Sequence, residues 1–579
     1  MNILVIGGGI SGVSAAKVAL KEGHAVTVVE AAPEPGGLMA RIANCRIGFR
    51  TFLDEIKGHP NLTILTKTRV KEVERRDDRY VVATDAGHVI DAHRVIVASG
   101  LVPYEAPQAQ GKRVLTSLEY DALIDQRNGD LPPDFERVAF VLCVGSRSRE
   151  YPLCSSVCCS YTIREIKWTL QRAEVGITVF YNDLRFFGQE FFMERLFRDA
   201  GVAFVRANSR FFEEDETGVT MRYFAEGKLK EERFSYVVLT MALRPNPDLL
   251  GLSRLFGFSL NGHGFVKEEE PLTTDAPNVF ASGGALEPMN VKDSILTGFG
   301  AGVLAVRGAS FLADVAARQD RFYREEAPEM PLPEGDFESC LFFMGSNAPG
   351  AAMFFEFVSA RFLEMARLLA GTGKTVYVVT RNMVTPSYGE LDYEETRRLG
   401  VIFIHLEEGE EIAFDNGEVR IEGPGRAFVL KVDRVIRFDD YEALFRDREI
   451  LSLYRSEPQL RWNPTRWGRK RYHVGFARHP RARRWEPREV LAALGEMLLD
   501  EEEERVYPEV DEERCSGCGS CKDACPHMAI EMEEREKEMA VFGPQGTAVA
   551  PVAVVREDAC VGCGLCASTC PSDVIRYSP

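Results

Sequence analysis

Short apolar runs alternate with longer amphipathic stretches along most of the chain. The first apolar runs are Asn2 to Ile6 and Ala25 to Val29, with a helical pattern between them. Val95 to Gly100 and Arg137 to Leu142 have the same strand-like character, and a second helical pattern follows the latter. Strands that alternate with helices predict parallel sheets covered by helices, that is, an α/β fold.

Length and composition add bounds to this picture. At 579 residues we expect about four domains, and 45% apolar with 27% charged residues is typical of a soluble protein. The net charge of -18 argues against general nucleic-acid binding. The strand-like start leaves no room for a signal peptide, and the most apolar window, 340–358, contains Gly345, Pro349 and Glu356. We therefore expect a cytoplasmic protein without membrane insertion.

A glycine fingerprint follows the first apolar run. Gly7, Gly9 and Gly12 have the G-x-G-x-x-G spacing, and Glu30 ends the second run. The first glycine permits a tight turn, the second a close approach of pyrophosphate, and the third close helix packing, while the acidic residue binds ribose hydroxyls. Glycine-rich turns also occur as plain structure, but strand, helix and acid together predict a dinucleotide site.

Further glycines favour FAD over NAD as the dinucleotide. Gly36 and Gly37 after Glu30 resemble the second glycine turn of two-dinucleotide-domain flavoproteins of the disulfide-reductase class, and Gly100 ends the strand expected to close the first half of such a domain. Gly283 marks a later strand and turn, and Asp293 precedes a helix expected to point its amide end at the flavin, with a surface βα turn as the alternative. Where the wider class has an aspartate this chain has Gly284, so contact with the ribityl chain would run through backbone.

A cysteine cluster follows the strand at Arg137 to Leu142. Where a disulfide reductase would carry a second fingerprint for NAD(P)H, the chain has Cys143 and no G-x-G-x-x-G, and then Cys154, Cys158 and Cys159 at the start of a helix. Buried free cysteines and a catalytic dithiol are the alternatives. Four thiols within 17 residues favour an iron–sulfur cluster.

The last 75 residues carry two C-x-x-C-x-x-C-x-x-x-C-P runs. In this arrangement the fourth cysteine of each run ligates the other cluster, and zinc gives no reason for such spacing. One 4Fe-4S cluster is expected on Cys515, Cys518, Cys521 and Cys570, and the other on Cys560, Cys563, Cys566 and Cys525. Of 14 cysteines only Cys45 and Cys340 remain, which indicates metal ligation in a reducing compartment and not a disulfide framework.

The region after about residue 337 repeats the middle of the chain at an offset of about 200 residues, without its cysteines. Chance likeness of two α/β segments is the alternative. The expected segments are 1–134 and 244–325 for the FAD domain, 135–243 for the cluster-bearing Rossmann-like domain, 337–500 for its degenerate copy without a cofactor, and 505–579 for the ferredoxin domain. Within the copy, the segment 461–488 is basic and aromatic, but the five acids at 500–504 favour neutralisation within the chain, or contact with a redox partner, over nucleic acid.

The fingerprint, "CVGSR", "CSSVCC", "HPN" at His59 to Asn61 and the terminal ferredoxin together resemble the A subunit of heterodisulfide reductase. The resemblance implies that the four middle cysteines bind a 4Fe-4S cluster near FAD. It also implies that Arg164 stands where the family has a lysine near the flavin. Glu119 is a weaker candidate for a second residue near the flavin, and a solvated glutamate on a helix face is the favoured alternative for it. Arginine is not an interchangeable proton donor. Compared with the full-length form of the family, we expect a truncated form without the N-terminal domain and the inserted ferredoxin, and the upstream cysteine pair of the family survives only as Cys45.

These observations predict an electron-transfer component with FAD and three 4Fe-4S clusters, working with other redox subunits of a larger anaerobic complex and with a soluble ferredoxin as a further candidate partner. The resemblance implies flavin-based electron bifurcation or confurcation as one mode of action. A self-sufficient NAD(P)H-dependent oxidoreductase is the main alternative, and a binding module with structural redox centres is a third.

Overall fold

The computed structural model describes most of the chain. The described residues are 1–109, 111–127, 131–186, 190–207, 210–225, 227–312, 323–325, 330–345, 354–407, 409–441, 466–467, 471–475, 485–499, 508–525, 529–539, 546–556, 560, 566–567, 570 and 574–577. Within these residues no helix has the length and apolar character needed to cross a lipid bilayer.

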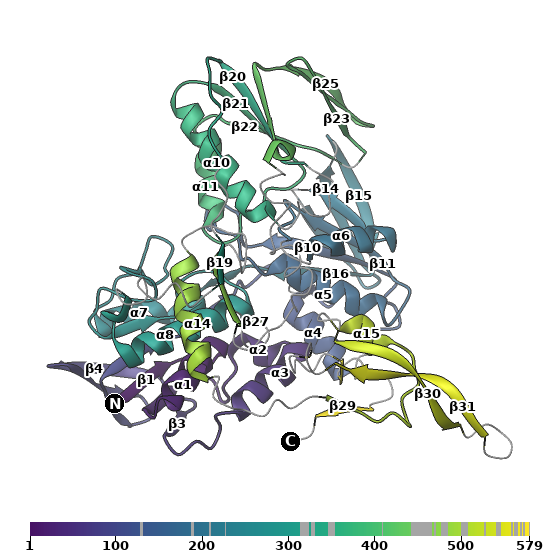
Figure 1. The fold of residues 1–579 in the computed structure, drawn as a ribbon. Coiled ribbons are helices and arrows are strands. Elements are labelled where there is room, and N and C mark those ends of the chain that lie inside the picture. The colour runs from purple at the N-terminus through teal and green to yellow at the C-terminus, as the bar shows by residue number, and fades with distance from the viewer. Residues whose placement is uncertain are drawn as a thin grey trace.

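The first domain, residues 1–109 and 244–312, contains a parallel sheet in the order β18-β7-β1-β2-β3. Its strands β1 and β3 are labelled in Figure 1. Its strands are almost continuously apolar because helices cover both faces of a parallel sheet. The strands are β1 (Asn2–Ile6), β2 (Ala25–Val29), β3 (Leu62–Leu65), β7 (Arg94–Val97) and β18 (Val279–Ala281), and an antiparallel sheet of β4 (Val70–Arg76), β5 (Arg79–Thr84) and β6 (Val89–Ala92) is inserted. The helices are α1 (Ile10–Lys21), α2 (Gly37–Arg41), α3 (Ala43–Asp54), α7 (Asp248–Phe256), the short η1 (Gly283–Ala285) and α8 (Val291–Arg307).

The middle domain, residues 111–243, has a second parallel sheet in the order β12-β11-β10-β16-β9. Two antiparallel strands, β8 (Leu101–Pro103) and β17 (Leu243–Pro245), join it to the first domain. Its strands are β9 (Val114–Thr116), β10 (Arg137–Val144), β11 (Gly176–Tyr181), β12 (Ala203–Arg206) and β16 (Tyr236–Met241), with an antiparallel sheet of β13 (Arg210–Glu214), β14 (Val219–Ala225) and β15 (Lys228–Phe234) and helices α4 (Ser117–Gln126), α5 (Cys158–Leu170) and α6 (Glu190–Asp199). Because β9 pairs with β16, the boundary expected at 134 falls too late.

The repeat domain, residues 330–441, follows the same plan. Its parallel sheet has the order β22-β21-β20-β26, which corresponds to β12-β11-β10-β16, and a three-stranded antiparallel sheet again precedes the last strand. The elements are β20 (Ser339–Phe343), α10 (Phe355–Gly371), β21 (Thr375–Thr380), α11 (Gly389–Arg398), β22 (Ile402–His405), β23 (Glu411–Asp415), β24 (Glu418–Glu422), β25 (Ala427–Lys431), β26 (Arg434–Arg437) and η4 (Phe438–Tyr441). The shared order agrees with the repeat seen in the sequence.

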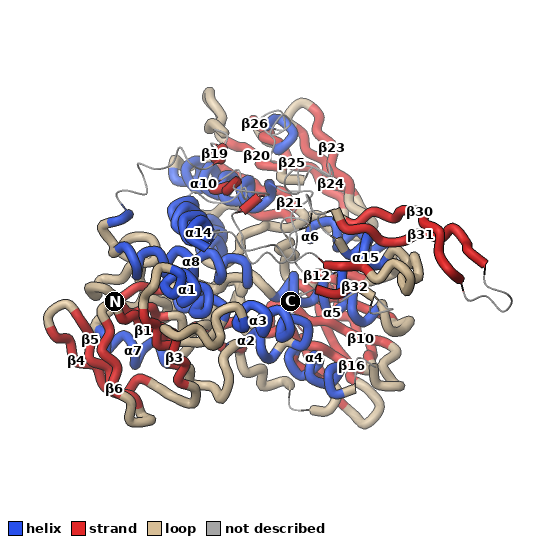
Figure 2. Tube along the Cα trace, turned by 60° about the horizontal axis from the view of Figure 1, so that its bottom comes forward, coloured by secondary structure: helices blue, strands red, loops and turns tan. Residues whose placement is uncertain are grey.

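The last part of the expected segment 337–500 packs against the first domain and not within the repeat domain. Helix α14 (Glu486–Leu499) packs against α8 and α1 of the first domain, as Figures 1 and 2 both show, and Leu491 is fully buried there. An apolar face directed at α8 explains this placement. Most of the basic segment 461–488 lies outside the described residues, but its Trp485 and Arg488 are buried, and Arg488 pairs with Glu287 and Glu268. A small sheet of β19 (Tyr323–Glu325), β28 (Arg471–Gly475) and β27 (Arg466–Trp467) lies next to α14.

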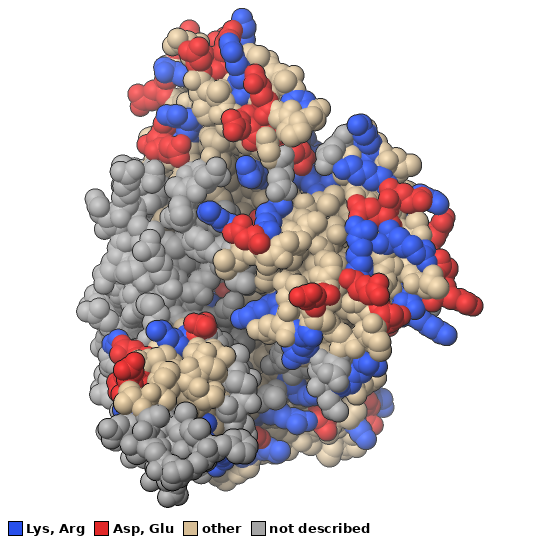
Figure 3. All heavy atoms as spheres, turned by 90° about the vertical axis from the view of Figure 1, so that its right-hand side faces the viewer, with Lys and Arg blue, Asp and Glu red and all other residues tan. Residues whose placement is uncertain are grey.

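The C-terminal domain, residues 508–577, is held by an antiparallel pair of its first and last strands. A long hairpin projects from it (Figures 1 and 2). Its elements are β29 (Pro508–Val510), α15 (Ser520–Ala524), β30 (Ile530–Met539), β31 (Gly546–Val555) and β32 (Ile575–Tyr577). On the face drawn in Figure 3, basic and acidic side chains are interspersed.

Candidate flavin and iron–sulfur sites

A cavity of about 880 Å³ runs between the first and middle domains. One end is lined by Gly7, Gly9 and Glu30 of the first domain, and the other by Tyr161 and Arg164 on α5. This volume is in the upper range for cofactor sites and matches an elongated dinucleotide. The cavity therefore joins the two parts of the sequence that were expected to hold FAD and a cluster.

The three fingerprint glycines have three different environments. Gly7 has φ +111°, and a Cβ there would lie 2.2 Å from the Ala98 carbonyl oxygen. A Cβ on Gly12 would lie 2.0 Å from the carbonyl oxygen of Gly7, so this glycine permits close packing and does not line the cavity. A Cβ on Gly9 would meet nothing within 4 Å and Gly9 lines the cavity just before α1. The geometry fits a pyrophosphate that passes over Gly9 at the helix N-terminus.

Glu30 is fixed at the end of β2. Its carboxylate accepts hydrogen bonds from the backbone N–H groups of Gly8 (2.7 Å) and Ala32 (2.8 Å), and the residue lines the cavity. The next turn contains Gly36 with φ +136° and Gly37 with φ +52°, both of which line the cavity. The positive φ angles explain why glycine occupies these two positions.

The returning segment closes the cavity. Gly100, with φ +72°, and Asp293 line the cavity. Gly283 does not line it and packs closely against α1, since a Cβ on Gly283 would lie 2.6 Å from the Cβ of Ser11. Asn290 caps α8 by accepting a hydrogen bond from the Asp293 N–H (2.9 Å). At Gly284 a Cβ would lie 2.4 Å from Leu101 Cγ, so the structure has no room for the aspartate of the wider class.

The four middle cysteines are brought together between β10 and α5. All four are buried: Cys143 is the last residue but one of β10, Cys154 lies in the loop, and Cys158 and Cys159 begin the helix. The hydrogen bond with the Cys143 thiol lowers the pKa of Cys158. The hydrogen bond with Cys159, burial, and the charges of Cys159 and Cys154 outweigh it, so the net shift of this pKa is well above the usual value. Within the described residues no three ligand-type side chains converge on a single-ion site. A four-iron cluster offers a separate iron atom to each thiolate, so four neighbouring cysteines fit it without meeting at one point.

The loop that carries these cysteines fits an anionic sulfur cluster in other respects. Backbone N–H groups of Ser156 and Arg185 donate to the sulfur atoms of Cys154 (3.4 Å) and Cys159 (3.5 Å). Cys143 and Ser156 both have φ +62°, which costs a non-glycine residue of order 1 kcal/mol each and indicates a tightly determined loop. The positive end of the α5 dipole also favours negative charge here.

Cys158 belongs to both sites. It is one of the four clustered cysteines and also lines the cavity, beside Val157 and Tyr161. A cluster on these cysteines would therefore adjoin a flavin placed at this end of the cavity.

Arg164 lines the same end of the cavity. Its Nη2 lies 3.0 Å from an Asp121 oxygen, its Nη1 lies 3.8 Å from Cys45 Sγ, and its guanidinium stacks 4.3 Å from the Tyr161 ring centre. Burial lowers the pKa of Arg164, but the charges of Asp121 and Tyr161 outweigh it, so the net shift is upward. Arg164 thus presents a fixed positive charge to the cavity.

The remaining candidates near Arg164 are less central. Glu119 is exposed, forms a capping box with Thr116 at the start of α4 and does not line the cavity, although Ser117 and Leu118 do. Asp121, fully buried against Arg164 and hydrogen-bonded by the Tyr161 hydroxyl, is the acidic residue that the structure places here. No sequence signal marks it, because it lies about 40 residues before its partners.

The C-terminal cysteines are also grouped. Cys515, Cys518, Cys521 and Cys570 line one small pocket, which is the ligand set expected for the first cluster of the ferredoxin. Cys521 and Cys566 are buried in the core of this domain, and Cys525 and Cys560 are described as well. Cys563 lies outside the described residues.

Family comparisons agree with this geometry. The family described as pyridine nucleotide-disulphide oxidoreductase matches residues 1–120, and the 4Fe-4S dicluster domain matches residues 514–574. Fold and matches define an α/β flavoprotein of the two-dinucleotide-domain class with a 4Fe-4S ferredoxin domain at its C-terminal end. The fold class expected from the sequence is confirmed.

The relatives are more specific. The A subunit of H(2):CoB-CoM heterodisulfide,ferredoxin reductase from Methanothermobacter thermautotrophicus is 29% identical over 242 residues, 37% of each chain. The iron-sulfur A subunit of CoB–CoM heterodisulfide reductase from Methanocaldococcus jannaschii is 24% identical over 413 residues, 52% of this chain and 63% of the relative. The predicted resemblance to the A subunit of heterodisulfide reductase is thus confirmed, and the chain spans less than two thirds of either relative. Thioredoxin reductase of Lactococcus lactis matches 53% of this chain and 97% of its own at 15% identity, with a TM-score of 0.41.

Proposed function

We propose that this chain is the FAD and iron–sulfur electron-transfer component of a larger anaerobic oxidoreductase. It would hold FAD in the cavity, one 4Fe-4S cluster on Cys143, Cys154, Cys158 and Cys159, and two in the C-terminal domain. The observation that most strongly supports this proposal is that Cys158 lines the cavity and also belongs to the four-cysteine group. Flavin exchanges electron pairs for single electrons, and iron–sulfur clusters carry single electrons.

The residues of the chain would position the cofactors and set their charge balance. The N-termini of α1 and α8 would bind the pyrophosphate, and Glu30 the ribose. Arg164 would favour added negative charge on the flavin ring, because its guanidinium lines that end of the cavity. It would do so without donating a proton, since arginine stays protonated.

An interaction with other redox subunits, or with a soluble ferredoxin, is part of the proposal, as is a reducing, cytoplasmic location. The names of the relatives refer to subunits of reductases, which supports a partner for this chain. In its more specific form, the proposal is that the flavin carries out electron bifurcation or confurcation. A single two-electron transition in an anaerobic titration of the flavin would support it, and two resolved one-electron transitions would contradict it.

The geometry disfavours the self-sufficient NAD(P)H-dependent enzyme. After β10, where a nicotinamide dinucleotide would need an open glycine turn, a Cβ on Gly145 would lie 2.2 Å from the Tyr104 ring. Arg244 stacks on that ring at 4.3 Å and donates to the Gly145 carbonyl oxygen (3.0 Å). We expect NADH and NADPH to reduce the flavin of the isolated chain no faster than buffer alone, as followed anaerobically by the visible absorbance of the flavin.

Cys158→Ser tests the central assignment, with Cys340→Ser as the matched control. Cys340 is a fully buried free cysteine on β20, the strand that corresponds to β10. We expect Cys158→Ser to lower the iron content by the equivalent of one cluster and to slow electron transfer from reduced flavin to the C-terminal clusters. Unchanged iron and transfer in Cys158→Ser would overturn the proposal.

A further inference from the structure

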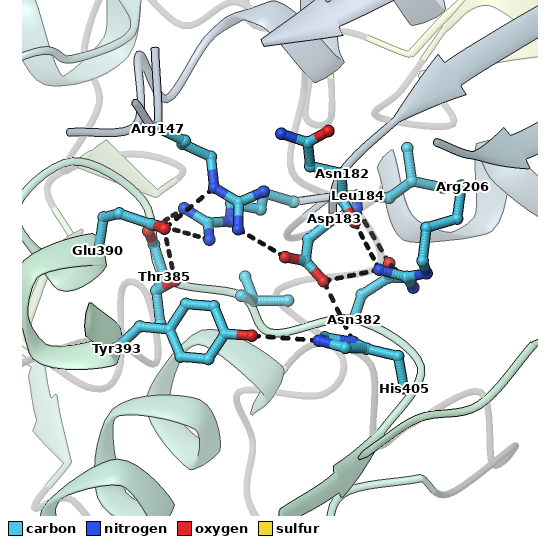
Figure 4. Close-up of polar contacts among 12 residues, drawn as sticks. Arg147, Asn182, Asp183, Leu184, Arg206, Asn382, Thr385, Glu390, Tyr393 and His405 are labelled. Carbon is cyan, nitrogen blue, oxygen red and sulfur yellow. Dashed lines mark hydrogen bonds and ion pairs between the residues drawn. The ribbon is translucent and has the colours of Figure 1, made fainter. Parts of the chain in front are cut away.

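The middle and repeat domains meet in a buried network of charged side chains (Figure 4). From the middle domain come Arg147, Asp183 and Arg185, and from the repeat domain comes Glu390 on α11. The side chains of these four residues are at most 9% exposed. Buried charges of this kind interact strongly because little water screens them.

Glu390 binds both arginines. Its Oε1 lies 3.0 Å from Arg147 Nε, and its Oε2 pairs with the Arg185 guanidinium. Arg185 also donates to the Thr385 carbonyl oxygen at 2.6 Å, which fixes it against the repeat domain. The repeat domain thus supplies a carboxylate to two cations that belong to the middle domain.

The same two arginines adjoin the four-cysteine group. Arg147 follows Cys143 in the loop, and the backbone N–H of Arg185 donates to Cys159 Sγ (3.5 Å). Burial lowers the pKa of Arg147, yet the negative charges of Asp183 and Glu390, and then of the Cys143 and Cys154 thiolates, raise it well above its ordinary value. The guanidinium Nη1 of Arg147 is buried with no hydrogen-bond partner among the described residues. It is therefore a donor that an acceptor on a sulfur cluster would satisfy.

These contacts give Glu390 leverage over the cluster. A cluster held by four thiolates is net negative and gains one more negative charge on reduction, so nearby cations favour the reduced form. A carboxylate that pairs with those cations opposes their effect. The degenerate domain would then act on a redox centre that it does not itself contain.

We propose that the repeat domain sets the reduction potential of the cluster in the middle domain, with Glu390 as the positioning and charge-compensating residue for Arg147 and Arg185. The inference rests on the proposed function, because it requires a cluster on the four cysteines. It assigns a role to a domain for which the sequence indicated no cofactor.

Two substitutions at one ion pair test the proposal. Glu390→Gln removes the negative partner, and Arg147→Gln removes a positive one. In EPR-monitored redox titrations of the full chain, Glu390→Gln should raise the midpoint potential of the middle cluster and Arg147→Gln should lower it. At fixed ambient potential we expect the ratio of reduced to oxidised cluster to change about tenfold, which is about 59 mV for a one-electron couple.

The opposite signs separate electrostatics from structure. Both variants break the same contact, so mere loosening of the interface would shift the potential in one direction or not at all. Glu390→Asp, which keeps the charge, should restore a potential close to that of the native chain. Glu410→Gln is the matched control, because Glu410 is a buried carboxylate of the repeat domain that pairs with Arg426, and it should leave the potential unchanged.

The readout also distinguishes the two proposals. The signal of the middle cluster is assigned by its loss in Cys158→Ser. If that variant keeps all its iron and all its signals, the proposed function fails. If the signal is lost there, but Glu390→Gln and Arg147→Gln leave its potential unchanged or move it in the same direction, the present inference is overturned and the proposed function stands.

Discussion

The turn between β1 and α1 predicts opposite results for one substitution made at two glycines. Gly9 has φ -77°, which alanine adopts freely, and a Cβ there would meet nothing within 4 Å. At Gly12 a Cβ would lie 2.0 Å from the Gly7 carbonyl oxygen and 3.1 Å from Val5 Cγ1. Gly9→Ala therefore fits the protein without FAD, whereas Gly12→Ala does not.

The magnitudes follow from this geometry. Gly9→Ala should change the free energy of unfolding of the flavin-free chain by less than about 0.5 kcal/mol. Its methyl group would fill space needed by the pyrophosphate, and overpacking of this kind costs about 1–3 kcal/mol, or a rise of about 5- to 150-fold in the Kd for FAD. For Gly12→Ala, helix propensity favours alanine by about 1 kcal/mol, but this close contact should cost about 2–3 kcal/mol, so we expect a net loss of about 1–2 kcal/mol in stability.

The assay combines denaturant unfolding of the flavin-free chain with fluorescence titration of FAD. Gly371→Ala in the repeat domain is the control, since a Cβ there also meets nothing within 4 Å and lies outside the cavity. A wild-type Kd in Gly9→Ala would refute the reasoning, because it would mean that the dinucleotide does not pass over this glycine.

Three further substitutions test other parts of the structure. Arg164→Met leaves buried Asp121 without its cation, and should lower the free energy of unfolding by about 3 kcal/mol and also lower the flavin midpoint potential. The control Arg46→Met breaks a half-exposed ion pair with Asp125 and should cost less than about 1 kcal/mol of stability. Equal losses of stability in the two variants would contradict this prediction. Burial raises the pKa of Asp183, but the charges of neighbouring arginines and a histidine outweigh this effect and hold the pKa below its usual value. The ionised Asp183 therefore contributes its full stabilisation of the folded state above about pH 4, and this contribution is lost as the pH falls. Thermal unfolding from about pH 7 down to about pH 3 should show a shallower acid limb in Asp183→Asn, and an unchanged limb would exclude this contribution. Leu491→Ala should lower the free energy of unfolding by about 2–5 kcal/mol and weaken FAD binding, because Leu491 is buried where α14 packs against α8. Unchanged stability and FAD content would show that this packing does not support the first domain.

Local patterns predicted the parts of the site whose residues are close in sequence. The spacing of Gly7, Gly9 and Gly12 between two apolar runs defines the first turn, and Cys154 to Cys159 lie within one loop and helix start. The physical reason is that a turn or a ligand set of this kind has a fixed local geometry.

Contacts between distant segments were not predictable in this way. Asp121 on α4 contacts Arg164 on α5, 43 positions later in the sequence. Glu390 contacts Arg147, from which it is separated by 243 positions. The placement of α14 was missed for the same reason: its apolar pattern predicts a helix, but not the surface against which the helix packs.

The same helix has a consequence for biosynthesis. The core of the first domain is assembled from the start of the chain, from 244–312 and from α14, so the middle and repeat domains are complete on the ribosome before the last helix of that core emerges. At about 5–20 residues per second, the nascent first domain waits of the order of ten seconds or more for α14. During that interval α8, whose first residues line the cavity, lacks the helix that packs against it, so the dinucleotide site of a newly made chain rests on an incomplete core.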